Sequence, residues 1–558
     1  MRRRKIAMFG VGILIVGVVL GMQIGSAISS DDTYESMKKV EQAFAVINKR
    51  YVDDVDPTAL AEEAIDGMLD ELDPHSIYIN AERMRDVTEN FNASFEGIGI
   101  SYEFVEGGDE GDTLAVLNPL PGGPSETVGL WSGDRIVAVD DSSAIGFTQV
   151  DVERKLKGAR GTKVDITVVR PGYEAPLDFT ITRDKIPLHT LDVAYMLDNQ
   201  TGYIKLQRFA RTTYNEFMEA SRELKKEGMQ RMVLDLRNNT GGFMDMAVRI
   251  SDEFVSGDKI IVSSKSRHTD FSYENRARVK GLLEDMPVIV LVNEQSASAS
   301  EIVAGALQDH DRGLIVGRRT FGKGLVQKQF PFKDGSVLRM TISRYYTPSG
   351  RFIQTPYNDG NKEDYYKSKF EKRQDEVSMN AEDLLGQIPD SLKYLTSAGR
   401  TVVGGGGILP DFIIRRDSIS LYVQAVLGQQ HDTEFVRKWI DSNSDQFHKT
   451  WSENRSGFLS DFQLSDQAMN SFDSYLEEQG IHIVADTEGY ESTKEERYFT
   501  RKEVDEERAW MKNLLKARIA SRMFDPAAWY PVRHDYDVTL NQAMGLWGSA
   551  EQLLAMDE

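Results

Sequence analysis

Hydrophobic residues near the start of the chain recur at every third or fourth position, which is the spacing of one face of a helix. This spacing extends from Thr33 to about Thr88, and the turn Asp73-Pro74-His75 interrupts it. We therefore expect a helical arm over residues 30–90, with His75 in a structural role beside the proline turn. The apolar residues with helical spacing are Met37, Val40, Phe44, Ile47, Leu60, Ala64, Met68 and Leu72.

The pattern changes to short strands and turns over residues 91–175. Apolar runs there alternate with glycine- and proline-rich turns, and two short helices separate some of the runs. This pattern predicts a small β-rich domain. Its predicted strands and turns are Gly97–Ile100, Leu114–Leu117, Gly133–Val139 and Val164–Arg170.

Apolar strand candidates alternate with amphipathic helices from residue 176 to residue 416. Buried strands separated by helices are typical of an α/β layered core. The predicted strands are Gly202–Leu206, Met232–Leu236, Val288–Val292, Leu314–Gly317 and Ile408–Asp411. Glycines become rare beyond this point, so we expect residues 417–558 to form a helical C-terminal extension, to which the sequence attaches no chemistry.

The first residues predict a membrane segment. Four basic residues, Arg2 to Lys5, precede an uncharged run that extends from Ile6 to Ser29. Positive charge followed by about 20 apolar positions keeps the start of the chain inside and sends the rest across the membrane. We expect residues 1–29 to be a retained single-pass anchor. The alternative is a cleaved signal peptide, for which Gly25-Ser26-Ala27 offers a cut site.

Composition narrows the classes of function. The 558 residues include 66 Lys and Arg, 88 Asp and Glu and no cysteine, which gives a formal net charge of −22. Because clustered basic residues bind nucleic acids, this acidity argues against a nucleic-acid partner. The lack of cysteine excludes disulfides, thiolate metal sites and cysteine nucleophiles. We expect no metal and no organic cofactor.

The candidate chemistry lies between residues 292 and 327. A buried strand ends at Asn293, and Ser296, Ser298 and Ser300 then alternate with alanines before a helix begins. At least one hydroxyl is therefore on a sharp turn from strand to helix, a position that exposes a nucleophile above a sheet. A serine can also cap a helix. One serine is enough for a cap, so three require a further reason.

A serine hydroxyl needs a base. His310 is the histidine nearest in sequence, but it lies in a charged turn and is interpreted as a solvated surface residue. The other candidate is Lys323, between Gly322 and Gly324, where the upstream glycine of a phosphate-binding loop is missing. Burial must lower its reference pKa of about 10.4 by about 2–3 units before it can act near neutral pH. Gln327 could hold the neutral amine by hydrogen bonding.

These motifs resemble the C-terminal processing peptidases, also called tail-specific proteases, which are serine proteases with a PDZ domain and a Ser-Lys dyad. The resemblance covers roughly residues 35–416. It implies that Ser298, the middle serine of the Ser-Ala-Ser-Ala-Ser-Glu motif, is the nucleophile. It further implies that Lys323 of the Phe-Gly-Lys-Gly motif is the general base and that Gln327 supports it.

The resemblance also implies an oxyanion hole. Residues 235–242 match the family motif Asp-Leu-Arg-x-Asn-x-Gly-Gly. One N–H donor is expected from this glycine-rich loop, at Gly241, at Gly242 or at the residue after them, and the second from Ala299. Removing one such donor typically raises the barrier by about 3–4 kcal/mol.

Residues 91–175 resemble a PDZ domain. In this resemblance Gly97, Ile98, Gly99 and Ile100 form the loop that binds a terminal carboxylate, while a peptide adds to an exposed strand edge. The family often has Arg-Gly after the PDZ helix, at a position proposed to sense the peptide, whereas this chain has Lys157-Gly158. A lysine cannot make the bidentate carboxylate contact of an arginine.

We therefore predict a multidomain α+β protein: a membrane helix, a helical arm, a PDZ domain, a protease core that the resemblance implies is ClpP/crotonase-like, and a helical extension. The predicted function is cleavage of proteins with exposed C-terminal tails, by an enzyme in the inner membrane facing the periplasm. The helical arms could assemble copies into a homo-oligomer. The alternatives are an inactive PDZ scaffold for envelope proteins and a hydrolase that uses His310 as base.

Overall fold

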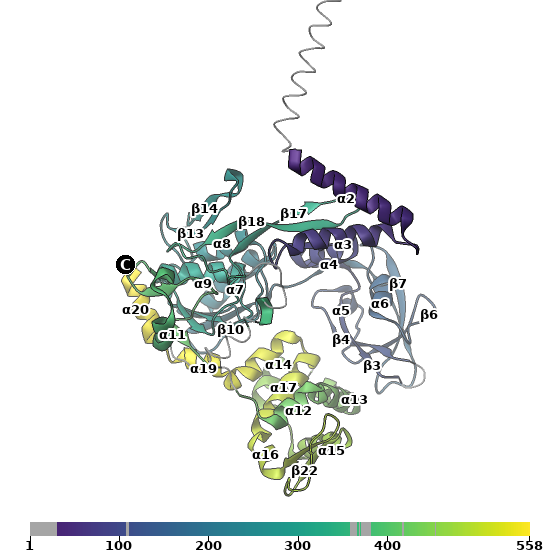
Figure 1. Ribbon diagram of the computed structural model, residues 1–558. Helices are drawn as coiled ribbons and strands as arrows, with labels where there is room; N and C mark the ends of the chain where they lie inside the picture. Colours follow the sequence, from purple (N-terminus) through teal and green to yellow (C-terminus); the bar gives the residue numbers. More distant parts are fainter. Residues whose placement is uncertain are drawn as a thin grey trace, which may run out of the picture. The chain divides into compact units, whose positions relative to one another are not determined.

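The computed structural model describes residues 31–557 apart from residues 108–110, 279, 358–364, 368, 370–380, 416–417 and 452–453. The chain divides into two compact units (Figure 1). One takes its residues from positions 1–80, 329–340 and 357–365, and the other contains the remainder. The predicted anchor over residues 1–29 lies outside the described residues. Within the described part of the chain, no helix has both the length and the apolarity needed to cross a membrane.

The first unit contains the helical arm only up to residue 80, because helix α4 (Ala81–Asn92), which covers the end of the predicted arm, belongs to the second unit. Its helices are α2 (Asp31–Arg50) and α3 (Pro57–Asp70), and Asp56 caps α3 by accepting the N–H of Thr58 at 2.8 Å. The arm also holds strand β1 (Ile77–Ile79), which the helical spacing did not predict. Strand β1 pairs antiparallel with residues 337–339 of β18 (Val337–Tyr346), a partner far along the chain that a local pattern cannot reveal.

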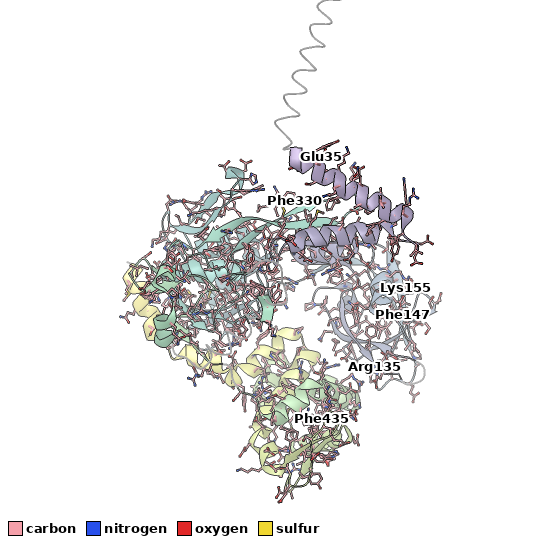
Figure 2. The ribbon with its side chains drawn as sticks, viewed as in Figure 1. Glu35, Arg135, Phe147, Lys155, Phe330 and Phe435 are labelled. Carbon is pink, nitrogen blue, oxygen red and sulfur yellow. The ribbon has the colours of Figure 1, made fainter. Side chains whose placement is uncertain are left out.

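The predicted PDZ domain lies in the second unit and is built on a sheet with the strand order β3, β4, β5, β7, β8. Burial alternates along β7, so that Val164, Ile166 and Val168 point into the core of this domain. Phe147, which Figure 2 labels, packs against the same core. Its elements are α4 (Ala81–Asn92), β2 (Ser94–Gly97), β3 (Ile100–Val105), β4 (Thr113–Pro119), α5 (Pro124–Thr127), β5 (Arg135–Val139), β6 (Ser142–Ser143), α6 (Gln149–Leu156), β7 (Lys163–Val169), β8 (Leu177–Thr182) and β9 (Asp184–Pro187).

The predicted protease core contains a six-stranded sheet with the order β10, β11, β12, β15, β16, β21. All neighbouring pairs are parallel except β10 with β11. The strands are β10 (Leu191–Met196), β11 (Thr201–Leu206), β12 (Arg231–Asp235), β15 (Val288–Val292), β16 (Leu314–Gly317) and β21 (Phe412–Ile413). Four predicted strands are confirmed here, but the strand expected at residues 408–411 begins only at Phe412.

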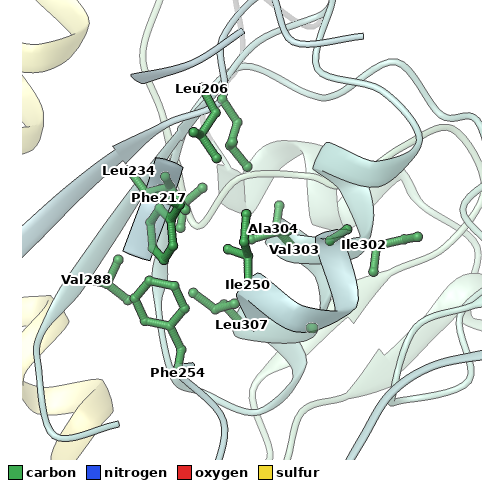
Figure 3. Packing of buried hydrophobic residues seen from close by; sticks show 14 of the residues in the cluster. Leu206, Phe217, Leu234, Ile250, Phe254, Val288, Ile302, Val303, Ala304 and Leu307 are labelled. Carbon is green, nitrogen blue, oxygen red and sulfur yellow. The ribbon is translucent and has the colours of Figure 1, made fainter. Parts of the chain in front are cut away.

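Helices cover both faces of this sheet. On one face, residues such as Leu234 and Val288 pack against α7 (Thr213–Lys226), α8 (Met244–Asp252) and α9 (Ala299–Asp309), as Figure 3 shows. On the other face, Val233 and Ile289 belong to a cluster with Leu540 and Trp547. The last two helices, α19 (Val538–Met544) and α20 (Trp547–Asp557), therefore cover part of the protease sheet.

Shorter elements surround the core. They are β13 (Ile260–Lys265), a 3₁₀ turn at Thr269–Phe271, β14 (Tyr273–Arg276), β17 (Leu325–Pro331), α11 (Ala381–Gln387), a 3₁₀ turn at Asp390–Leu392, β19 (Lys393–Leu395) and β20 (Thr401–Val403). Strand β13 pairs antiparallel with β14 and with residues 344–346 of β18.

The rest of the C-terminal extension has a hydrophobic core of its own, in which Phe435 is buried. Its helices are α12 (Leu421–Gly428), α13 (His431–Trp451), α14 (Arg455–Asp461), α15 (Asp466–Glu478), α16 (Arg501–Glu506), α17 (Arg508–Met523) and α18 (Trp529–Arg533), with 3₁₀ turns at Pro526–Ala528 and His534–Tyr536. The extension also contains a parallel pair of strands, β22 (Ile481–Val484) and β23 (Arg497–Thr500), where the sequence predicted only helices.

Candidate active site

Ser298 lies at a strained turn between strand β15 and helix α9. Its backbone angles are φ 55° and ψ −110°, which serine rarely adopts. Such strain persists only where the surroundings fix the backbone, and it is often found at active sites. The sharp turn from strand to helix predicted from the sequence is therefore confirmed, and it falls at Ser298.

The two flanking serines have structural roles. The hydroxyl of Ser296 donates to the carbonyl of Leu236 at 2.8 Å, and the hydroxyl of Ser300 donates to the carbonyl of Asn239 at 2.8 Å. The turn over residues 296–300, which contains the candidate nucleophile, is called the nucleophile turn below. Both bonds connect it to the glycine-rich motif loop, residues 235–243. Two of the three serines are thus needed to hold the turn, which leaves Ser298 as the nucleophile candidate.

Lys323 and Gln327 are in direct contact. The Lys323 Nζ atom donates to Gln327 Oε1 at 2.9 Å, and Gln327 lies on strand β17. The backbone that follows the lysine is also fixed, because Gly324 donates to Gln354 Oε1 and accepts from the N–H of Tyr345, both at 2.9 Å. The structure therefore brings together the predicted base and the residue predicted to hold it.

Glu301 connects the nucleophile turn to the loop over residues 320–324, which contains Lys323. Its Oε2 atom accepts the backbone N–H groups of Ser298 and Lys323, each at 2.8 Å. Its Oε1 atom accepts the N–H of Gly322 and the hydroxyl of Thr320, each at 2.6 Å. One fully buried carboxylate thus holds the backbone of both dyad candidates.

The sequence analysis did not assign a role to Glu301. Burial raises the pKa of Glu301 above its ordinary value, while the hydrogen bonds from Thr320, Lys323, Gly322 and Ser298 oppose that rise. The pattern Ser-x-x-Glu at residues 298–301 matches a helix capping box, and this signal could have identified the residue.

Tyr345 is a second residue that the sequence analysis missed. Its buried hydroxyl donates to the carbonyl oxygen of Ser298 at 3.1 Å. Burial raises the pKa of Tyr345 well above its ordinary value, so the hydroxyl stays protonated and remains a donor. Glu301 and Tyr345 thus hold the N–H and the carbonyl of the same strained residue.

The motif loop lies against Ser298. A side chain at Gly241, where φ is +98°, would place its Cβ atom 2.8 Å from the Ser298 Cβ atom and 2.9 Å from the Ala299 nitrogen. Only glycine fits at such a close approach. The Gly241 N–H donates to Asn239 Oδ1 at 2.9 Å, so this predicted oxyanion donor is already occupied by a side chain of its own loop.

The backbone N–H groups of Gly242 and Phe243, the two residues that follow Gly241, point in different directions. The carbonyl of Gly241 and the N–H of Phe243 both bond to Phe209, at 2.9 and 2.7 Å. The N–H and C=O groups of a trans peptide point in opposite directions, so the N–H of Gly242 points away from Phe209. Gly242 and Ala299, the first residue of helix α9, therefore remain as candidates for the oxyanion donors.

His310 is far from Ser298. It follows the C-terminal end of α9, whereas Ser298 precedes the N-terminal end, and 11 residues of helix rise by roughly 16 Å. The prediction of a solvated histidine is wrong, because His310 is only 7% exposed and its Nε2 atom lies 2.6 Å from the carbonyl oxygen of Ile260. The structure gives no support to a Ser-His hydrolase.

The predicted carboxylate-binding loop connects β2 to β3 in the PDZ domain. Its Ile98 side chain is buried, and the Ile98 carbonyl accepts the N–H and the hydroxyl of Ser125 at 3.0 and 2.7 Å. Gly99 has φ +77°, and Gly97 and Ile100 flank this turn. Strand β3 is at the edge of the PDZ sheet, so its outer side can receive an added strand.

Lys157 follows the PDZ helix α6 and pairs with Glu89 of α4 at 2.8 Å. Burial acts to lower the pKa of Lys157, but the contacts with Glu89 and other carboxylates outweigh burial and raise it. The buried guanidinium of Arg183 lies beside Gly158 and donates to the carbonyl groups of Lys155 and Leu156. Arg183 thus caps the C-terminal end of α6.

In the ranges that the structure describes, no group of three or more His, Asp or Glu side chains could hold a metal ion. The site instead offers a hydroxyl on a strained turn, an amine held by an amide oxygen, and backbone N–H groups. An α/β core with this site, next to a PDZ domain, defines a serine-type protease.

Comparisons with known protein families cover most parts of the chain. Peptidase family S41 matches residues 200–366, and the PDZ domain family matches residues 88–169. The family described as the activating protease CtpB N-terminal domain matches residues 21–83. A family of unknown function (DUF8443) matches residues 422–525.

Individual proteins agree with the family matches. A carboxy-terminal-processing protease of Bartonella bacilliformis is 35% identical over 356 residues, which cover 63% of this chain and 80% of that protein. A probable CtpA-like serine protease of Staphylococcus aureus is 34% identical over 343 residues, covering 61% of this chain and 67% of that protein. The chain belongs to the family of carboxy-terminal-processing proteases.

Solved structures include a similar protein. The photosystem II D1 C-terminal processing protease is 27% identical, with a TM-score of 0.32, and the match covers 67% of this chain and 92% of that chain.

Proposed function

We propose that the protein is an endopeptidase that captures the C-terminal tails of proteins with its PDZ domain and cleaves them with the dyad Ser298 and Lys323. The observation that carries this proposal is the contact of the Lys323 amine with Gln327, in a loop that Glu301 ties to the Ser298 turn. The amide oxygen of Gln327 accepts a hydrogen bond from the amine and adds no charge beside it.

In the proposed reaction, the Ser298 oxygen attacks the peptide carbonyl carbon and its proton passes to the Lys323 amine. The N–H groups of Gly242 and Ala299 stabilise the oxyanion that forms. The protonated amine then gives the proton to the leaving amine as the peptide bond breaks. Water, with its proton taken by Lys323, releases the acyl group and regenerates the serine.

The PDZ domain supplies the selection of substrate in this proposal. Strand β3 offers a free edge for an extended tail, and the loop of Gly97, Ile98, Gly99 and Ile100 offers backbone N–H groups for the terminal carboxylate. Recognition of a free carboxylate makes the end of the chain, rather than an internal sequence, the signal.

Two peptides that differ only at the C-terminus test this selection. We expect an unstructured peptide with a free carboxylate to have a KM about tenfold lower than the same peptide with a C-terminal amide, because the amide lacks the charge that strengthens these hydrogen bonds. Cleavage kinetics with purified protein measure the difference, with Ser298→Ala as the inactive control. Equal KM values for the two peptides would rule out recognition of the tail carboxylate.

We also infer a position in the cell envelope, with the protease facing the periplasm. The inference comes from sequence alone, from the basic residues 2–5 and the uncharged run that follows. We expect the protein in the membrane fraction of cells, with its PDZ domain cut by a protease added to spheroplasts. Recovery in the cytosolic fraction, protected from added protease, would contradict it. Assembly into a homo-oligomer stays a prediction.

A further inference from the structure

An ion pair connects the C-terminal extension to the motif loop. Asp537 pairs with both terminal nitrogens of the Arg237 guanidinium, Nη1 with Oδ1 at 2.9 Å and Nη2 with Oδ2 at 2.6 Å. On its other side the same guanidinium pairs with Asp235, which is fully buried. Two carboxylates thus hold Arg237, one from the motif loop and one from a segment outside the core of the family resemblance.

The motif loop is in turn bonded to the nucleophile turn. The carbonyl of Asn239 accepts the N–H of Ala297 at 3.0 Å and the hydroxyl of Ser300 at 2.8 Å, on either side of Ser298. Asn238 and Asn293 exchange two further bonds, at 3.0 and 2.7 Å. A shift of the backbone near Arg237 would therefore move the nucleophile turn.

Asp537 itself is firmly placed. Its Oδ1 atom accepts the N–H of Leu540 at 2.9 Å and so caps helix α19, which packs on the protease sheet. In the segment before it, Tyr530 donates to Asp192 of strand β10 at 2.7 Å. The side chain of Asp537 is 24% exposed and borders a polar cavity of about 460 Å³, so a substitution there leaves no void in the core.

We propose that Asp537 is a positioning residue of the protease reaction. By holding Arg237, it fixes the motif loop, and through that loop it fixes Ser298 and the Gly242 N–H relative to a bound peptide. The extension would then be part of the catalytic apparatus without touching the substrate. This inference rests on the proposed function, because it assigns Asp537 a role in the reaction of Ser298.

Asp537→Asn separates the two roles of the side chain. Asparagine keeps one oxygen, which can still accept the N–H of Leu540 and Arg237 Nη1, but it lacks the charge and places an NH₂ group against Arg237 Nη2. We expect kcat for an unstructured peptide to fall on the order of tenfold with KM unchanged, since small misplacements of reacting groups have large effects on rate. The rate at which a fluorophosphonate labels Ser298 should fall equally, while the urea midpoint of unfolding stays near that of the wild type.

Three further variants complete the experiment. Asp537→Ala, which removes both cap and ion pair, should show the same loss of kcat and a lower urea midpoint. Asp535→Asn, at a side chain that is 76% exposed, should behave as wild type. An unchanged kcat and labelling rate in Asp537→Asn would overturn the proposal, as would a loss explained by the fraction of unfolded protein. Activity retained by Ser298→Ala would instead refute the proposed function.

Discussion

Replacing Lys323 with alanine is expected to lower kcat on the order of 10²–10⁴-fold, the usual contribution of a general base. Replacing Ser298 with alanine should remove measurable cleavage, because no acyl-enzyme can form. The Lys323 side chain is partly buried and bonded to Gln327, so its removal should affect the reaction far more than the fold. Initial rates on an unstructured peptide measure both effects.

Lys328→Ala is the matched control for this experiment. Lys328 is exposed on the same strand as Gln327, and its removal should leave kcat unchanged. Circular dichroism and urea unfolding should show that all three variants are folded. Cleavage at the wild-type rate by folded Lys323→Ala would reject the lysine as base.

Replacing Glu301 with glutamine is expected to have the second largest effect. One carboxylate oxygen becomes an NH₂ group that faces two donors, either the N–H groups of Ser298 and Lys323 or the N–H of Gly322 and the hydroxyl of Thr320. Each buried donor left without an acceptor costs about 1–3 kcal/mol. We expect the free energy of unfolding to fall by about 2–5 kcal/mol and kcat to fall at least about a hundredfold in the fraction that remains folded.

Urea unfolding and peptide cleavage, measured on the same samples, separate these two effects of Glu301→Gln. Glu223→Gln is the control, because Glu223 makes only an exposed ion pair with Lys226, whose loss costs less than about 1 kcal/mol. Wild-type stability and activity in Glu301→Gln would show that the carboxylate does not hold the two loops together.

Sequence periodicity predicted those parts of the fold that depend on local pattern. Fully apolar runs such as Val288–Val292 became buried parallel strands, and the alternation around Ile166 became a PDZ strand. Strand β1 was missed because three residues carry no clear period and its partner is distant in sequence. The role of α19 and α20 was missed for a similar reason, since the sequence of a helix does not show which surface the helix covers.

The candidate site also contains residues that could be proposed from the sequence and residues that only the folded structure reveals. Lys323 and Gln327 could be proposed from the sequence because their residue types suit a chemical role, whereas the choice of Ser298 among three serines rested on the family resemblance. Glu301 and Tyr345 act through backbone groups of other residues, and such bonds become visible only when the loops are in place. Whether Gly241 or Gly242 offers its N–H depends on peptide orientation, which one sequence does not contain.

The proposed function depends on the activation of Ser298 by Lys323. Labelling with a fluorophosphonate followed by peptide mapping tests it most directly, because the reagent forms a covalent bond with an activated serine. The account predicts one modified residue, Ser298, and a labelling rate that falls on the order of 10²–10⁴-fold in Lys323→Ala. Modification of another serine, or equal labelling rates with and without the Lys323 amine, would contradict it.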